Sequence, residues 1–352
     1  MHLPFEAYEL LDHLPWRVAG PIKNRFPPRV GYFHVFSKEP LIVLIPEDFY
    51  DDAANWAPFF AKLKRRRVYF ICLVRGPIDA QPSEYPLARV LSGHKVTYPE
   101  HRFVFLANNL KQLEMYTQLD VEAVLVNQNA LVDERLFDVI EDSSKKYDAI
   151  YNARISPIKR HYLASRIERL ALITIVDGKT NQEYLSHVVQ ALPNATWLNF
   201  EGKPRVRGYR RFSPAEVSKY LNQASVGLCL SRYEGAMFAA VEYLLCGLCV
   251  LATPSFGGRE AFFDDEYVEI ADDTAEALKR GLDALLARRP APAHVRQRTL
   301  RKIGEHRATL VDLICRIHAR EGGHLDPRET QARLFPDQFY KLRPLHHVLS
   351  VR

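Results

Sequence analysis

Several features of membrane-bound and secreted proteins are missing from this sequence. No uncharged apolar run approaches the roughly 18 residues that cross a bilayer. The N-terminus, MHLPFEAYELLDHLPWRV, has no basic segment followed by a continuous apolar core. We therefore expect neither a membrane-spanning helix nor a signal peptide, and we predict a cytoplasmic protein.

Common catalytic and metal-binding motifs are also absent. The chain has no G-x-x-x-x-G-K-[ST] loop, which argues against an ATPase, and no G-x-S-x-G element or other nucleophile–base pattern. The histidines show no metal-ligand spacing, and Cys246 and Cys249 form a lone CxxC without a second pair. We expect buried, reduced thiols and no bound metal.

The composition is that of a globular protein with a modest excess of positive charge. Of its 352 residues, 47% are hydrophobic and 26% are charged, which is ordinary for a soluble globular protein. The length exceeds what one hydrophobic core usually supports, so we predict two domains. The net charge of +6 suits an anionic partner, such as a phosphorylated substrate or an anionic membrane face. The absence of interleaved aromatic and basic residues argues against nucleic acid.

The most basic run is KLKRRR, residues 62–67, which follows an amphipathic segment and precedes the strand-like run VYFICLV. Cations at the end of a helix interact favourably with its negative pole, so a solvated helix end is the simpler interpretation. A patch that faces a membrane or a substrate is the alternative.

Short β-rich runs alternate with amphipathic helical patterns along most of the chain. In the first half PLIVLI, VYFICLV, RFVFLA and VEAVLV are separated by helical segments, and LALITIVDG, ATWLNF, SVGLCLS and LCVLAT continue the alternation in the second half. This order predicts an α/β protein with parallel sheets. Ligands of such sheets bind beyond the carboxyl ends of the strands.

A domain boundary is expected near YDAIYNARISPIKRH, where a strand-like run ends and Pro157 interrupts the chain before the next helix. We predict a first domain over residues 1–150 and a second over 151–324. The tail, residues 325–352, is expected to pack back on the first domain.

The stretch EGAMFAAVE places Glu234 and Glu242 eight positions apart, after a predicted buried strand. A helix beginning near Gly235 would expose unpaired N–H groups and the positive end of its dipole, which suits a phosphate. Eight helical residues span about 12 Å. One carboxylate could then bind sugar hydroxyls and the other ribose hydroxyls, with a diphosphate between them.

The boundary segment NARISPIK supplies two cations, Arg154 and Lys159, directly after a predicted strand. Arginine grips phosphate with two parallel hydrogen bonds, and lysine acts as a mobile point charge. Together they could stabilise a departing diphosphate when a sugar–phosphate bond breaks.

These blocks resemble the donor site of retaining GT-B glycosyltransferases of family 4. The resemblance rests on Glu-x7-Glu followed by LLCGLCVLATPSFGGREAF, on NARISPIK, on FEGKPRVRGYR, and on YVEIADDTAEALKRGLDAL, in family order over about residues 147–290. It implies two Rossmann-like domains facing each other across a cleft and a nucleotide-sugar donor, UDP- or GDP-linked, with no further cofactor and no metal. The first domain shows little of the family signature.

The resemblance also implies a role for each matching residue. Arg154 and Lys159 would contact the diphosphate, Glu234 the donor sugar and Glu242 the ribose, while Gly235, Ala236, Met237 and Phe238 would line the sugar and phosphates and Tyr209 would border the base. The chain departs from the family at Met237, where a second glycine is frequent, and at Phe238, where a proline-containing run is frequent.

In the first domain, VLVNQNALVDE places Asn127, Gln128 and Asn129 after a predicted strand. These amides could hydrogen-bond sugar hydroxyls. Polar residues after a strand are also common as turn formers, so both interpretations stay open.

The expected function is therefore retaining transfer of a hexose-type sugar from a nucleoside diphosphate to a saccharide or lipid-linked acceptor, in bacterial polysaccharide or glycolipid synthesis. Peripheral contact with the inner face of the membrane is a further expectation. The alternatives are a nucleotide-sugar epimerase of the same fold and a non-catalytic protein that binds a nucleotide sugar.

Overall fold

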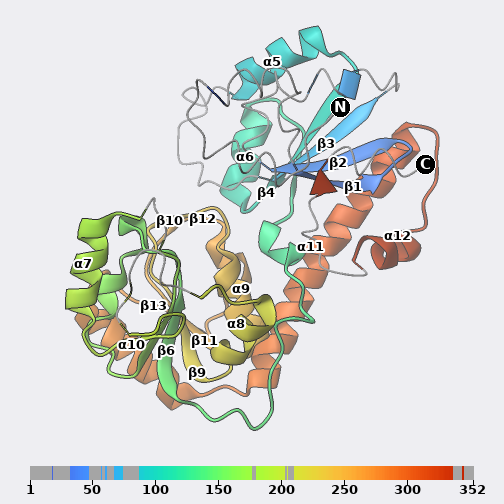
Figure 1. Cartoon of the computed structure of the whole chain (residues 1–352). Coiled ribbons are helices and arrows are strands. Elements are labelled where there is room, and N and C mark those ends of the chain that lie inside the picture. Colours follow the sequence, from blue (N-terminus) through green and yellow to red (C-terminus); the bar gives the residue numbers. More distant parts are fainter. Residues whose placement is uncertain are drawn as a thin grey trace.

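A computed structural model describes residues 18, 32–46, 57, 60, 61, 67–73, 87–176, 180–202, 204, 210–335 and 343–344. Within these residues the chain forms two α/β domains, each built on a six-stranded sheet (Figure 1). The predicted α/β class is confirmed.

The first domain contains a sheet with the strand order β14-β1-β2-β3-β4-β5. Its strands are β1 (Tyr32–Ser37), β2 (Leu41–Pro46), β3 (Val68–Leu73), β4 (His101–Ala107), β5 (Ala123–Leu125) and β14 (Arg343–Pro344). Strands β2 to β5 are parallel, whereas β1 runs antiparallel to both β2 and β14. Helices α5 (Leu87–Thr97) and α6 (Leu110–Gln118) follow β3 and β4.

Strand β2 shows why this sheet is covered on both faces. Leu41, Val43 and Ile45 pack in one core with residues of α5 and α6, whereas Ile42 and Leu44 pack in another core with residues of α11. Successive side chains of a strand point to opposite faces. A continuous apolar run such as PLIVLI is therefore what a doubly covered sheet requires.

The second domain contains a fully parallel sheet with the strand order β13-β11-β9-β6-β7-β8. Its strands are β6 (Tyr147–Asn152), β7 (Leu170–Ile173), β8 (Thr196–Trp197), β9 (Ala224–Cys229), β11 (Cys249–Ala252) and β13 (Val268–Ile270). Its helices are α7 (Gln182–Ala191), α8 (Pro214–Leu221), α9 (Phe238–Leu245) and α10 (Ala275–Arg288). A small parallel pair, β10 (Tyr233–Glu234) and β12 (Phe256–Gly257), lies above this sheet in Figure 1.

The strand order creates one position at which the chain changes direction across the sheet. From β6 the chain continues to β7 and β8 on one side, and then returns to β9 on the other side of β6. The carboxyl ends of β6 and β9 are therefore neighbours, and the chain leaves them toward opposite edges of the sheet. Ligands of open α/β sheets bind in the crevice at such a point.

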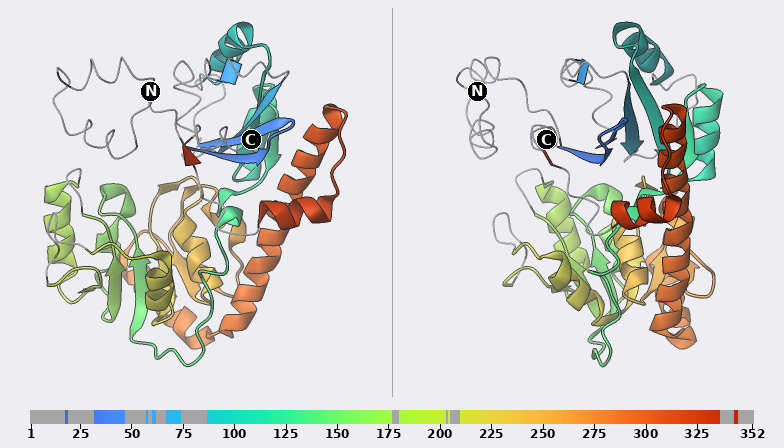
Figure 2. Two further views of the ribbon diagram at one scale, coloured as in Figure 1. Left: turned by 45° about the vertical axis from the view of Figure 1, so that its right-hand side comes forward. Right: turned by 90° about the vertical axis from the view of Figure 1, so that its right-hand side faces the viewer.

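Helix α11 (Pro292–Arg320) belongs to both domains. Its 29 residues span about 43 Å. Val295 and Ile303 lie in the core of the second domain, whereas Leu310 and Ile314 lie in a core of the first. Figure 2 shows this long helix running along one side of both domains.

The chain crosses between the domains at two places. The second sheet begins with β6, upstream of the expected boundary at residue 151, and α11 returns to the first domain upstream of residue 324. Helix α12 (Pro327–Leu334) follows it and buries Leu334 in the same core. None of the helices among the described residues is both long and apolar enough to cross a membrane.

Candidate active site

A cavity of about 700 Å³ opens at the carboxyl ends of the second domain's strands, which is the size of many small-molecule sites. Its lining includes eight of the twelve residues that the sequence predicted for the site: Gln128, Arg154, Lys159, Glu234, Gly235, Ala236, Met237 and Phe238. It also includes Thr174 after β7, Asn199 after β8, and Arg211 and Phe212. Neighbouring strands lie about 4.8 Å apart, so a cavity reaching from β9 to β8 extends over about 14 Å.

Lys159 and Glu234 meet at the point where the chain diverges from β6 and β9. The Lys159 ammonium donates to Glu234 Oε1, and both side chains are mostly buried. The same oxygen accepts a hydrogen bond of 2.5 Å from Ser231 Oγ. The structure thus brings together two residues that the sequence placed in one site.

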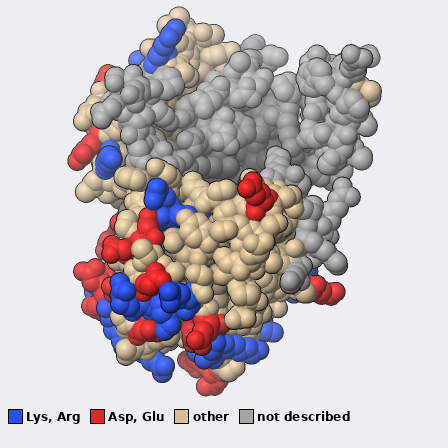
Figure 3. Space-filling model, turned by 90° about the vertical axis from the view of Figure 1, so that its left-hand side faces the viewer, with Lys and Arg blue, Asp and Glu red and all other residues tan. Residues whose placement is uncertain are grey.

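The charged residues of the cavity lining are Arg154, Lys159, Arg211 and Glu234. Within the described part of the chain, neither Arg154 nor Arg211 forms an ion pair with Glu234, which pairs with Lys159. Three cations against one carboxylate leave the lining positive, which suits an anionic ligand. On the outer face shown in Figure 3, by contrast, blue and red side chains are interspersed over the described surface of the second domain.

Helix α9 begins at Phe238, so the predicted helix start near Gly235 is wrong. Met237 precedes the helix with a positive φ of 58°, in the left-handed region that L-residues rarely adopt. The chain thus keeps, with a methionine, a backbone turn that glycine adopts without steric cost. Phe238 and Ala239, the first two residues of α9, line the cavity, so the positive end of the helix adjoins it, whereas the Ala240 N–H donates to the Met237 carbonyl at 3.0 Å.

The two glutamates of EGAMFAAVE consequently lie on different elements. Glu234 ends the short strand β10, whereas Glu242 lies in the second turn of α9. The eight-residue helical spacing expected between them is therefore wrong, because the helix includes only the second part of the stretch.

Glu242 is half-buried beside the end of β6. Its Oε2 accepts a hydrogen bond of 3.3 Å from Asn152 Nδ2, and Asn152 lines the cavity. Burial raises the pKa of the Glu242 carboxyl to about 7, and the Asn152 hydrogen bond opposes this shift. This carboxyl therefore changes its charge near neutral pH.

Tyr243 fixes the end of β6 from the same helix. Its hydroxyl accepts a 2.7 Å hydrogen bond from the backbone N–H of Asn152. The ring fits because Gly227 on β9 has no side chain: a Cβ there would lie 2.2 Å from two ring carbons. Gly227 and Tyr243 together set where Asn152 ends its strand.

Gly257 allows β12 to lie beside β10. Its φ is 120°, and a Cβ at this position would lie 1.6 Å from the carbonyl oxygen of Glu234. At the next position, a Cβ on Gly258 would lie 2.3 Å from Asn108 Cβ of the first domain. This glycine pair therefore brings three segments together behind the cavity.

Asn127 and Asn129 are fully buried at the contact between the domains. The amide of Asn127 donates to the carbonyls of Asn108, at 2.8 Å, and Gly258, at 2.7 Å. The amide of Asn129 donates to the Ala236 carbonyl at 2.5 Å. Both amides thus bind backbone rather than facing the cavity, whereas Gln128 between them lines it.

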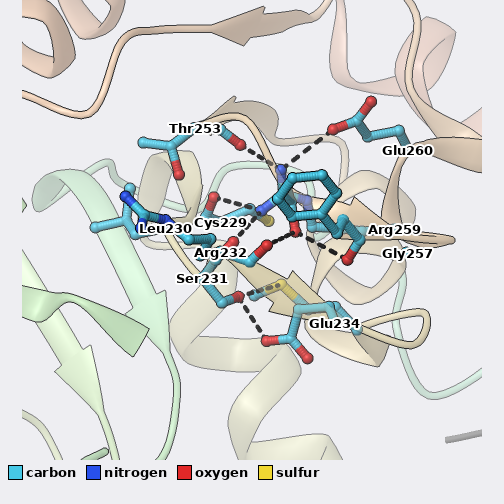
Figure 4. Close-up of polar contacts among 12 residues, drawn as sticks. Cys229, Leu230, Ser231, Arg232, Glu234, Thr253, Gly257, Arg259 and Glu260 are labelled. Carbon is cyan, nitrogen blue, oxygen red and sulfur yellow. Dashed lines mark hydrogen bonds and ion pairs between the residues drawn. The ribbon is translucent and has the colours of Figure 1, made fainter. Parts of the chain in front are cut away.

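Two buried arginines were not anticipated from the sequence. Figure 4 shows Arg259 among backbone carbonyls, and its Nη1 donates to Cys229 at 2.8 Å and Ser231 at 3.2 Å while its Nη2 donates to Thr253 at 2.5 Å. Arg160 donates from Nε to the Leu230 carbonyl at 2.7 Å. Arginine is usually exposed, so only adjacency to Lys159 and to the glycine pair could have signalled these two residues.

Some predicted features lie outside the described residues. Tyr209 is one of them, as are residues 62–66 of the basic run. Arg67, the last residue of that run, forms an ion pair of 2.8 Å with Glu321, just beyond α11. Among the described residues, no group of three or more His, Cys, Asp or Glu side chains is arranged to hold a metal ion.

Comparison with known proteins gives a family match for part of the chain and a similarity of fold. Residues 134–302 match the family described as glycosyl transferases group 1. No curated protein matches the sequence significantly.

Three solved structures illustrate the structural similarity. HepE from Anabaena in complex with UDP has a TM-score of 0.52 at 13% identity, over 75% of this chain and 74% of that chain. Sucrose-phosphate synthase from Thermosynechococcus elongatus has a TM-score of 0.50 at 14% identity, over 75% and 76%. A glycosyltransferase from Rickettsia africae ESF-5 has a TM-score of 0.50 at 14% identity, over 72% and 77%. The predicted GT-B fold with two Rossmann-like domains is confirmed.

Proposed function

We propose that the protein transfers a sugar from a nucleoside diphosphate to an acceptor hydroxyl with retention of anomeric configuration. The match of residues 134–302 to the glycosyl transferases group 1 family supports this proposal. The acceptor is a saccharide or a lipid-linked saccharide, as in bacterial polysaccharide or glycolipid synthesis. UDP is the first nucleotide to test, since HepE was solved in complex with UDP, and GDP is the second.

The observation that carries this proposal is the Lys159–Glu234 pair at the mouth of a positive cavity. A donor of this class has a dianionic diphosphate between two polyhydroxylated rings. Carboxylates accept hydrogen bonds from hydroxyls, and cations with helix N–H groups bind phosphate. The cavity places both kinds of group within one ligand's length.

Different parts of the cavity suit different parts of the donor. The diphosphate lies against Arg154, Lys159 and the first N–H groups of α9, and the transferred sugar lies at Glu234. The ribose lies toward Asn152 and Glu242. The base extends toward the ends of β7 and β8, where Thr174 and Phe212 line the cavity.

The reaction breaks the bond between the anomeric carbon and the β-phosphate oxygen and forms a bond from the same carbon to the acceptor oxygen. The acceptor attacks the face that the phosphate leaves, and the departing β-phosphate takes the acceptor proton. Arg154 and Lys159 stabilise the negative charge that develops on the diphosphate. Glu234 holds the sugar in the geometry for this attack.

The test incubates the protein with UDP-, GDP- and ADP-linked hexoses, each with and without a panel of saccharide acceptors. Acceptor-dependent transfer with the donor's anomeric configuration in the product, unaffected by EDTA, is the expected result. Free isomerised sugar would instead identify an epimerase. Nucleotide-sugar binding without turnover would identify a non-catalytic protein, and an inverted product would reject retention.

A further inference from the structure

Two arginines bind three consecutive backbone carbonyls, those of residues 229–231, a short distance before Glu234 in the chain. The carbonyls of Cys229 and Ser231 accept from Arg259, and the carbonyl of Leu230, between them, accepts from Arg160. Successive carbonyls of an extended chain point to opposite sides. The segment is therefore held from both sides, and Figure 4 shows the Arg259 side of it.

The same arginines also join this segment to the end of β11. Arg259 Nη2 donates to the Thr253 carbonyl at 2.5 Å, and Arg160 Nη2 donates to Thr253 Oγ1 at 2.6 Å. One residue after β11 is thus bound by both guanidinium groups. Two neighbouring strand ends are fixed relative to each other at the floor of the site.

We propose that Arg160 and Arg259 form a clamp that sets the position of the Glu234 carboxylate, so that both are positioning residues for sugar transfer. This inference rests on the proposed function. The clamp acts through Ser231, because its carbonyl accepts from Arg259 while its hydroxyl donates to Glu234 Oε1.

Contacts on the Arg160 side complete a closed ring. Lys159 pairs with Glu234. Arg160, which follows Lys159 in the chain, donates to the Leu230 carbonyl, and the hydroxyl of the next residue, Ser231, donates to Glu234. Arg160 adopts a positive φ of 49°, which lets adjacent side chains reach both partners. Moving any member of the ring displaces the carboxylate or the ammonium that flanks the donor.

Burial of Arg259 is costly for a residue with a purely structural role. Its side chain is 1% exposed, its Nε has no partner among the described residues, and its carboxylate neighbour, Glu260, lies at 3.4 Å and is 43% exposed. A buried cation whose one carboxylate partner is largely in solvent costs free energy that apolar side chains would not. What the guanidinium offers instead is a planar fork that can bind several carbonyls at once.

Arg259→Lys is the central test, because it keeps the charge and removes the fork. We expect kcat with the preferred donor to fall about 10- to 100-fold, the loss associated with misplacing a catalytic group by about 1 Å. Affinity for UDP alone, which lacks the transferred sugar that would contact Glu234, should stay within about threefold of the wild type. Arg259→Met should match Arg259→Lys, since geometry and not charge is at issue.

Arg296→Lys is the matched control. Arg296 also donates to three backbone carbonyls, those of Phe137, Leu245 and Glu134, but it lies at the start of α11. This variant should lose stability without losing kcat. Arg160→Lys should act like Arg259→Lys.

Ser231→Ala provides a milder variant that folds even if the arginine variants do not. It removes the hydroxyl that links the clamp to Glu234, so kcat should fall while UDP affinity is kept. Because both changes act on one carboxylate, Ser231→Ala combined with Arg259→Lys should cost less than the product of the two separate effects.

Several outcomes would overturn the inference. A folded Arg259→Lys protein with kcat within twofold of the wild type would show that the fork does not position Glu234. If Arg259→Lys lowered kcat and UDP affinity to the same extent, Arg259 would only stabilise the segment before Glu234. If the kcat losses of Arg259→Lys and Ser231→Ala multiplied in the double variant, Arg259 would not act on Glu234 through Ser231. A wild-type protein without turnover of any donor would remove the proposed function, and the clamp with it.

Discussion

Lys159 and Glu234 form an ion pair although 75 positions separate them in the chain. Lys159 follows β6 and Glu234 follows β9, and these strands are neighbours in the parallel sheet. The pairing therefore follows from the strand order, which brings the segments after β6 and β9 to one edge. It also places a mobile cation where a leaving diphosphate would need it.

Replacing Lys159 by alanine should lower kcat by about two to three orders of magnitude, because one preorganised positive group at the developing charge is lost. The free energy of unfolding should fall by about 1–3 kcal/mol, because the mostly buried Glu234 carboxylate loses its cation but keeps the hydrogen bond from Ser231. Initial rates at saturating donor and thermal unfolding measure the two effects. Lys219→Ala, on the exposed face of α8, is the control; equal activity of both variants would reject the role of Lys159.

The Glu242 carboxyl should make stability depend on pH. Its pKa is raised to about 7 by burial, compared with 4.5 in the unfolded chain. Between these values the folded state binds more protons than the unfolded state, so stability should decrease as pH rises from about 4.5 to 7 and then level off. Glu242→Gln should remove this component and stabilise the protein by about 1–3 kcal/mol at pH 8.

Chemical unfolding of wild type and Glu242→Gln at pH 5, 6, 7 and 8 measures the difference. The two proteins should converge at pH 5 and diverge toward pH 8. A constant difference at all four values would show that burial does not shift this carboxyl. If Glu242 holds the ribose, the variant should also bind UDP more weakly at pH 8.

Gly257→Ala should destabilise the protein by about 3 kcal/mol, because both its positive φ and the neighbouring carbonyl of Glu234 exclude a Cβ. The displaced carbonyl belongs to a site residue, so donor turnover should fall as well. Gly304→Ala is the matched control: nothing lies within 4 Å of its Cβ position in α11. There the same change should stabilise the helix by about 1 kcal/mol, and equal effects at both positions would contradict the geometry.

Asn127→Ala separates the two interpretations of the first-domain amides. The change removes the hydrogen bonds of this amide to the carbonyls of Asn108 and Gly258, which should cost about 1–3 kcal/mol of stability, although the Gly258 carbonyl still accepts from the Ala261 N–H at 3.3 Å. If the amide only joins the domains, the KM for donor and acceptor should be unchanged in the folded variant. A selective rise in KM would support sugar contact, and Asn194→Ala on the surface is the control.

Local patterns predicted the strands well because burial on both faces leaves a clear apolar run. PLIVLI includes all of β2 except its last residue, and SVGLCLS includes all of β9 except its first residue. The same runs located Arg154, Lys159 and Glu234 beyond strand ends, where the cavity is found. Site residues that directly follow a buried strand can thus be predicted from the sequence.

Features that depend on distant segments could not be predicted in this way. The positive φ of Met237 depends on the turn between β10 and α9, and nothing in a methionine signals it. The burial of Arg259 depends on carbonyls that the fold brings in from two strand ends. The amides of Asn127 and Asn129 found backbone partners more than a hundred positions away.

Helix α11 limits how the two domains can move relative to each other. A continuous helix anchored in both cores cannot lengthen, and bending it sharply would break its backbone hydrogen bonds. The two domains can therefore move relative to each other mainly by rotating about an axis close to this helix. Such rotation should displace most the parts of the two domains that lie far from α11.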